Sequence, residues 1–175
     1  MDGIRLLTTE AVTPLVAHLV RHAFESGRDE PFSRARSADD PPDPVALSRR
    51  LPAAWATQVG VPGWEICFGL WIDGVVRGHL EMRGGSIPTE MHRASLGMGI
   101  ERPYRRRGWG RQLLQTAIAW ARDRGLAWLD LGVFTDNTPA YALYVRAGFV
   151  EIGVTPDRFR IDGQTVDDRS MVLRL

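Results

Sequence analysis

Five arginines surround two glycines at the predicted start of a helix, in the segment RPYRRRGWGR at residues 102–111. The unpaired N–H groups and aligned peptide dipoles already make a helix start positive, so basic side chains there are unfavourable on their own. Gly108 and Gly110 leave those N–H groups open to an oxyanion, and the arginines add bidentate donors. We therefore expect the turn to bind a phosphate, most economically a pyrophosphate.

Two familiar phosphate-binding motifs do not fit this turn. The dinucleotide motif G-x-G-x-x-G would need glycine at Leu113, and no acidic ribose ligand follows about twenty residues later. A Walker A loop would need Gly-Lys-Ser or Gly-Lys-Thr, which the sequence does not contain. The remaining alternative is a solvated basic surface, because runs of like charge usually face solvent.

The strand that leads into the turn, residues 93–101, is apolar except where Gly97 and Gly99 interrupt it. Glycines inside strands mark bulges, or places where another backbone comes close. We expect a bulged strand, along which the amide groups of a ligand could lie as an additional strand. A bulge that serves only the curvature of the sheet is the alternative.

Tyr144 is predicted to lie on the inner face of helix 138–147, with Ala140, Leu143 and Ala147. A phenol on a buried face needs a hydrogen-bond partner. That partner could be a ligand, or merely a carbonyl or water next to a core tyrosine.

Glu81 is the first candidate for a catalytic base. It shares one face of the predicted strand 75–83 with His79. An unpaired carboxylate in the middle of a strand has little structural reason to be there, although ordinary surface charge is the alternative.

Glu101 is the second candidate base, on the same predicted strand face as Ser95. It ends strand 93–101 beside Arg102 and Arg105, where a surface ion pair would be a sufficient explanation.

The elements that must position these residues follow a mixed α/β order, in one domain over residues 1–175. An antiparallel first half precedes a β-α-β-α second half. Asp-Gly pairs between apolar runs predict two tight hairpins, at Asp73-Gly74 and Asp162-Gly163. The predicted strands are 3–7, 64–71, 75–83, 93–101, 127–134 and a final hairpin over 157–175. The predicted helices are 9–25, 45–57 with an interruption at Pro52, 108–125, and 138–147 with Thr138 as cap and Gly148 at the C-terminus.

Segment 26–44 is rich in proline, serine and charge, and is long for a loop in a compact domain. We expect a mobile lid, in which Asp29 and Glu30 could offer acidic contacts to a cationic substrate.

Composition and charge exclude several classes of function. The chain has 175 residues, 44% hydrophobic and 25% charged, with a formal net charge of +1. Near-neutral charge without interleaved aromatics argues against a nucleic-acid binder, and no apolar stretch predicts a membrane span. One cysteine, Cys67, excludes an intramolecular disulfide or a thiolate zinc cluster, and no leader is visible, so we expect a cytoplasmic protein without a metal.

Three segments together resemble the GNAT superfamily of acyl-CoA-dependent N-acyltransferases. They are IERPYRRRGWGRQLLQTAIAWARDRG, LDLGVFTDN and AYALYVRAGF, in the family's order and spacing. The resemblance covers about residues 64–175 in element order and 93–150 in motif detail. It implies a central, mixed, mostly antiparallel twisted sheet flanked by helices, with the bulged strand before the cofactor-binding helix.

The resemblance also implies roles for individual residues. The family turn R/Q-x-x-G-x-G/A corresponds here to Arg105 through Gly110, and would bind the coenzyme A pyrophosphate. The preceding strand end would pair with the pantetheine amides, Asn137 would hydrogen-bond the cofactor arm, and Tyr144 would protonate the leaving thiolate. The residues expected at the cofactor are Ile100, Arg102, Arg105, Arg106, Arg107, Gly108, Trp109, Gly110, Arg111, Asn137 and Tyr144.

The sequence therefore predicts an enzyme that transfers an acetyl group from acetyl-CoA directly to a primary amine of a small molecule or peptide N-terminus. One branch that acetylates ribosomal protein N-termini carries a glutamate where this chain has Gly132, so that substrate does not transfer directly. Rival hypotheses are a different acyl group and a catalytically silent sensor of acyl-CoA. A homodimer is compatible with the sequence, and the acceptor amine is left open.

Overall fold

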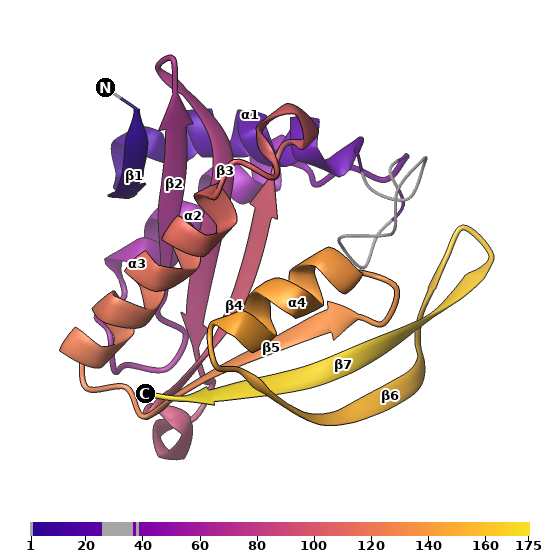
Figure 1. Cartoon of the computed structure of the whole chain (residues 1–175). Coiled ribbons are helices and arrows are strands. Elements are labelled where there is room, and N and C mark those ends of the chain that lie inside the picture. The colour runs from indigo at the N-terminus through magenta and orange to yellow at the C-terminus, as the bar shows by residue number, and fades with distance from the viewer. Residues whose placement is uncertain (1, 26–36, 38) are drawn as a thin grey trace.

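The computed structural model of the chain describes residues 2–25, 37 and 39–175. Its described strands form one seven-stranded sheet in the order β1-β2-β3-β4-β5-β7-β6 (Figure 1). The strands are β1 Gly3–Leu6, β2 Glu65–Ile72, β3 Val75–Gly84, β4 Arg93–Ile100, β5 Trp128–Phe134, β6 Val150–Ile161 and β7 Gln164–Arg174. The helices are α1 Val12–Ala23, α2 Pro44–Ala56, α3 Trp109–Asp123 and α4 Thr138–Arg146. Short 3₁₀ turns lie at Thr9–Ala11, Pro88–Glu90 and Arg102–Tyr104.

Neighbouring strands are antiparallel except β4 and β5, so the predicted mixed, mostly antiparallel sheet is confirmed. The parallel pair covers only three positions, from Arg93 opposite Trp128 to Ser95 opposite Asp130. Beyond Ser95 the two strands diverge, as Figure 1 shows. We call this divergence the strand fork.

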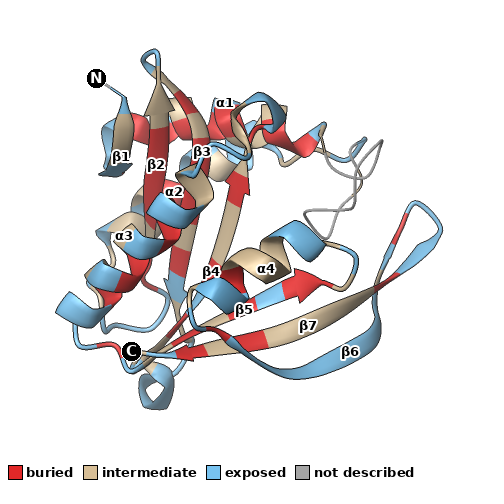
Figure 2. Cartoon of the chain, viewed as in Figure 1, coloured by how far each residue is buried: buried red, intermediate tan, exposed pale blue. Residues whose placement is uncertain are grey.

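Helices cover both faces of the sheet, and each pair has its own buried cluster (Figure 2). On one face, α1 and α2 pack on β2 and β3, with Leu15, Leu51 and Cys67 among the buried residues. On the other, α3 and α4 bury a larger cluster that contains Leu80, Leu113 and Tyr144. In α3 the buried positions are Leu113, Leu114, Ala117, Ile118 and Ala121, the stripe that the helical period predicts.

Both Asp-Gly hairpins form as predicted. Asp73 and Gly74 have φ of 51° and 74°, and Asp162 and Gly163 have φ of 51° and 77°, the left-handed pair of a type I′ turn. Gly148, with φ of 97°, ends α4 by donating its N–H to the carbonyl of Val145.

Three local predictions were wrong. Pro52 does not interrupt the helix but lies inside a continuous α2. The first turn of α2 is capped by the carboxylate of Asp43, 2.8 Å from the N–H of Val45. The predicted cap Thr138 belongs to the first turn of α4, and Asn137 caps it.

The third wrong prediction is the bulge in β4. Its register with β3 runs without a shift from Gly78 opposite Ile100 to Gly84 opposite Ala94, and the irregularity lies between β2 and β3 at Leu70 and Trp71. The glycines of β4 instead make room for side chains from neighbouring elements, as described below. Of the predicted lid, residues 26–36 and 38 lie outside the described residues.

Candidate functional site

The turn before α3 has a backbone that few residue types adopt. Arg106 has φ of 59° and Gly108 has φ of 83°, both left-handed. Gln112 donates the first intrahelical bond, to the carbonyl of Gly108 at 3.2 Å. The N–H groups of the preceding residues therefore point out of the helix end, where a bound anion would meet them. Arg106, Arg107 and Arg111 are exposed around them.

Arg102 and Arg105 fasten the turn to the end of α1. The backbone N–H of Arg102 lies 2.8 and 2.9 Å from the carboxylate oxygens of Glu25. Arg105 donates to the carbonyl of Ile100 at 2.8 Å and reaches Glu25 at 3.2 Å. Burial alone would raise the Glu25 pKa, but hydrogen bonds from His22 and Arg102 outweigh it and lower that pKa. The sequence assigns both arginines to the cofactor, and that role stays a prediction; the contacts described here hold the turn against Glu25.

Gly110 permits close packing. A β-carbon on this residue would lie 3.2 Å from Cδ2 of Leu143 and 3.7 Å from Cδ1 of Ile100. Glycine there lets the start of α3 approach α4, so the two predicted cofactor elements are neighbours.

Helix α4 contributes Asn137 and Tyr144. The side-chain oxygen of Asn137 accepts from the N–H of Ala140 at 3.3 Å, which leaves its amide N–H groups for other partners. The Tyr144 ring is buried, with 6% exposure, and packs edge-on against Phe149. Burial raises the Tyr144 pKa to about 12, so the phenol keeps its proton at physiological pH and can only donate it.

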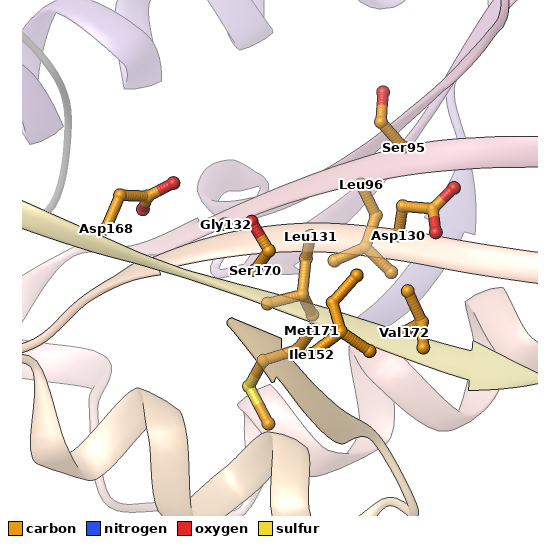
Figure 3. A pocket seen from close by; sticks show the side chains of 10 residues that line it. All are labelled: Ser95, Leu96, Asp130, Leu131, Gly132, Ile152, Asp168, Ser170, Met171 and Val172. Atoms are coloured by element: carbon orange, nitrogen blue, oxygen red, sulfur yellow. The ribbon is translucent and has the colours of Figure 1, made fainter. Parts of the chain in front are cut away.

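A groove of about 340 Å³ opens on the opposite face of the sheet, across the strand fork (Figure 3). Ser95 of β4, Asp130 and Gly132 of β5, and Asp168 and Ser170 of β7 supply its polar lining. A second hollow of about 210 Å³ continues from Ser95 and Asp130.

Asp168 is the groove's distinctive side chain. Its carboxylate lies over Gly132 (Figure 3), and burial raises its pKa while the charge of Arg158 acts against that rise. Asp130, by contrast, is held in a two-pronged ion pair with Arg93. Within the described ranges, Asp168 has no comparable ion pair. A carboxylate of this kind can bind an ammonium group.

Glu81 lies on this same sheet face, opposite Gly97 of β4, and a β-carbon at Gly97 would be 3.2 Å from its Oε1. Its Oε2 accepts from Arg83 at 2.8 Å, so the carboxylate has a partner. Burial raises the Glu81 pKa, and the charge of Arg83 only partly offsets that.

Glu101 is not the surface residue that the sequence suggested. It is 4% exposed and bonds His18 and Arg21 at 2.9 Å and Arg77 at 3.1 Å, rather than pairing with Arg102 or Arg105. Burial by itself would raise its pKa, but the hydrogen bonds from His18 and Arg21 prevail and hold it at about 2. A carboxylate with that pKa does not accept a proton at neutral pH.

Cys67 is buried, and burial raises its thiol pKa well above the usual range, so it is no nucleophile. Across residues 2–25, 37 and 39–175, no group of three or more His, Cys, Asp or Glu is arranged around a metal position. No helix in the described part of the chain is long and apolar enough to cross a bilayer.

Sequence reasoning missed two contributions. Asp168 and Ser170 belong to the C-terminal hairpin, and only the β5–β7 pairing brings them to the fork. The histidines of α1 meet His79 of β3 only in the folded sheet. The run of polar residues 167–170 inside a predicted strand was the available signal for Asp168 and Ser170.

Comparisons with known proteins agree with this architecture. The sequence model of the acetyltransferase (GNAT) family matches residues 33–149. The N-alpha-acetyltransferase RimI of Mycobacterium tuberculosis is 32% identical over 125 residues, which cover 71% of this chain and 72% of that protein. The L-amino acid N-acetyltransferase AaaT of Escherichia coli is 33% identical over 102 residues, covering 55% of this chain and 60% of that protein.

Solved structures share the fold. A GNAT-family acetyltransferase from Streptococcus pneumoniae superposes with a TM-score of 0.84 at 24% identity, over 100% of both chains. The protein yncA of Salmonella typhimurium, solved with its cofactor acetyl-CoA, gives a TM-score of 0.81 at 19% identity, over 99% of this chain and 94% of that one.

Proposed function

The chain belongs to the acetyltransferase (GNAT) family and is an acyltransferase, and we propose that it transfers an acetyl group from acetyl-CoA directly to a primary amine. The acceptor is a small molecule or a peptide N-terminus. The observation that carries the proposal is an arrangement across the strand fork. The anion-binding turn of α3 and the Tyr144 phenol lie on one face, and the acidic groove lies on the other.

Binding of the donor begins at the turn. The outward N–H groups of the first turn of α3 receive the pyrophosphate, and Arg106, Arg107 and Arg111 add charge. Beyond Ser95 the edge of β4 that faces β5 has no partner strand in the described structure, so its backbone groups can pair with amides of the cofactor arm. Asn137 offers amide donors from the start of α4.

The acceptor enters from the groove. Asp168 and Glu81 attract its ammonium form, since both carboxylates lie on the groove face of the sheet. Once neutral, the amine attacks the acetyl carbonyl, and a backbone N–H of β4 stabilises the oxyanion. Tyr144 then gives its proton to the departing thiolate. No covalent enzyme intermediate is needed.

The first acceptors to test are α-amines, because the two relatives are named for N-alpha-acetylation and for L-amino acid acetylation. Purified protein is mixed with acetyl-CoA and a panel of amino acids, peptide N-termini, polyamines and aminoglycosides, and thiol release is followed. The chain contains no lysine, so its own side chains supply no competing primary amine.

Three results would change the proposal. Acetyl-CoA binding without turnover on any amine would favour the silent sensor. Faster thiol release from propionyl-CoA or succinyl-CoA would reassign the acyl group. Failure of acetyl-CoA to raise the unfolding temperature would remove the cofactor site altogether.

A further inference from the structure

A buried series of hydrogen bonds joins α1, β3 and Glu101, the residue that follows β4. The carboxylate of Glu101 lies 2.9 Å from Nδ1 of His18, and Nε2 of His18 lies 2.9 Å from Nδ1 of His79. His18 is 0% exposed and His79 is 8% exposed. The three groups come from segments far apart in sequence, and no helix or strand needs them for its own hydrogen bonds.

The ionised carboxylate of Glu101 fixes which group donates and which accepts in each of these hydrogen bonds. Glu101 is a carboxylate at neutral pH, so it accepts from His18 and places that proton on Nδ1. Burial lowers the His18 pKa and keeps the ring neutral, so its Nε2 accepts from the Nδ1–H of His79. Burial likewise lowers the His79 pKa well below the usual value. The network therefore assigns a lone pair to Nε2 of His79.

The free end of this chain reaches Gly99, in the part of β4 that has left β5. A β-carbon at Gly99 would lie 2.9 Å from Cε1 of His79 and 2.5 Å from Nε2 of His22. Glycine is thus required for the imidazole edges to reach the backbone of β4. Among the described residues, Nε2 of His79 has no hydrogen-bond partner, although the ring is more than nine-tenths buried.

Other charges face the same rings. His22 stacks on His18 with ring centroids 5.7 Å apart and is itself bonded to Glu25 at 3.2 Å. The charged and titratable groups around His79 and its network are His18, His22 and Arg21 from α1, Arg77, Glu81 and Arg83 from β3, and Glu101 after β4.

We propose that Nε2 of His79 accepts the proton that the acceptor amine loses, and that His18 and Glu101 position His79 and take up the resulting charge. The inference rests on the proposed function. His79 is the catalytic residue here, whereas His18 and Glu101 are positioning residues.

The proton transfer balances along the chain. As the amine nitrogen bonds to the acetyl carbon, its N–H bond breaks and its proton moves to Nε2 of His79. The proton on Nδ1 of His79 moves to Nε2 of His18, which becomes an imidazolium beside the Glu101 carboxylate. The thioester C–S bond breaks with its electron pair on sulfur, and the histidines later release the proton to solvent.

This transfer of the proton from His79 to His18, which we call the relay, removes an electrostatic difficulty. Burial lowers the pKa of His79, and the neighbouring His18, His22 and Arg83 lower it further, so a positive charge held on His79 alone is unfavourable. Moving the charge to His18 places it 2.9 Å from an ionised carboxylate. Glu81 is paired with Arg83 instead and, within the described parts of the structure, has no histidine or second carboxylate bonded to it to take up the charge.

The decisive experiment compares His79→Gln with His92→Gln. His92 is exposed and takes no part in the hydrogen-bonded network, so it is the matched control. An acceptor active in the panel and acetyl-CoA are used, and kcat/KM is measured from pH 5.5 to 9. His79→Gln should lower kcat/KM by about 100-fold or more and abolish the acidic limb of the profile. Acetyl-CoA affinity by calorimetry should stay within about twofold, which also shows that the variant is folded.

Glu101→Gln tests the positioning role. It keeps an acceptor for His18 but removes the charge, so the acidic limb should move to lower pH while the maximal rate falls by about tenfold or more. Since two arginines lose a partner, nitrogen NMR of ¹⁵N-histidine in the wild type supplies a second readout. His79 should show a protonated Nδ1 and a bare Nε2 near pH 7.5, with His92 as the exposed reference.

The inference and the proposed function fail in different ways. A wild type that neither binds nor turns over acetyl-CoA contradicts the proposed function. An active wild type whose rate and pH profile are unchanged by His79→Gln, or whose His79 carries its proton on Nε2, overturns the relay. Loss of the acidic limb in His22→Gln alone would likewise overturn it, because the base would then be His22.

Discussion

Asp168 on β7 lies directly over Gly132 on β5. A β-carbon at residue 132 would be 2.7 Å from Oδ2 of Asp168, closer than real side chains approach. The carboxylate from one strand therefore occupies the space that a side chain on the next strand would fill. Because β5 and β7 are adjacent and antiparallel there, glycine at 132 is the condition for an acidic group at this place in the groove.

Asp168→Asn should raise KM for a cationic acceptor by about tenfold while kcat changes less, since it removes a charge that attracts the ammonium form. Initial rates at varied acceptor concentration give both constants. Asp123→Asn, at the exposed end of α3, is the charge-matched control. Equal KM values in the wild type and both variants would exclude Asp168 from acceptor binding.

Arg106→Ala and Arg107→Ala should each weaken acetyl-CoA binding by about tenfold, because each removes a charged donor to the pyrophosphate. Wild-type protein should gain about 2.7 kcal/mol of stability at a ligand concentration 100 times Kd. Calorimetry measures the affinities, with Arg122→Ala in the last turn of α3 as control. If Arg122→Ala is as damaging as the other two, the effect is nonspecific charge and not the turn.

Tyr144→Phe removes the phenol and keeps the ring that packs against Phe149. We expect kcat to fall by about 100-fold or more with acetyl-CoA affinity almost unchanged, since a general acid acts only in the chemical step. Stopped-flow thiol release measures the rate. Turnover at the wild-type level would make Tyr144 a packing residue.

Glu81→Gln separates attraction from proton transfer. Because Glu81 is paired with Arg83, we expect a rise in KM of less than about tenfold, with the acidic limb of the pH–rate profile retained. The measurement is the full profile of kcat/KM beside that of His79→Gln. Loss of the limb in Glu81→Gln but not in His79→Gln would return the base to Glu81.

Stability should fall as the pH drops below about 6.5. Burial lowers the pKa of His18 and of His79 in the folded protein, whereas both take up protons near pH 6.5 when unfolded. The unfolded chain then binds more protons, so unfolding becomes easier, by up to about 1.4 kcal/mol per pH unit for each histidine.

Urea unfolding at pH 7.5, 6.5 and 5.5 measures this dependence. His79→Gln should flatten the slope, and His92→Gln should run parallel to the wild type. A wild-type free energy of unfolding that is constant over the range would contradict the buried, neutral state of these rings.

Local patterns predicted much of the fold. Apolar periodicity located α3 and its buried stripe, and Asp-Gly pairs located both hairpins, because these signals act over a few neighbouring residues. Local patterns gave the wrong prediction where a contact between residues far apart in sequence determines the structure. Pro52 stays inside α2 because the helix packs Leu51 into the buried cluster with α1, which outweighs one lost backbone bond.

By itself, the sequence determined that a helix begins at a glycine- and arginine-rich turn, and that Tyr144 faces inward from the following helix. Both follow from the spacing of residues along one segment. The tertiary structure alone decided that Arg105 binds Glu25, that Glu101 is buried among His18 and two arginines, and that Asp168 reaches Gly132. These contacts join residues from separate elements, and the order of strands in the sheet, which no local pattern specifies, brings them together.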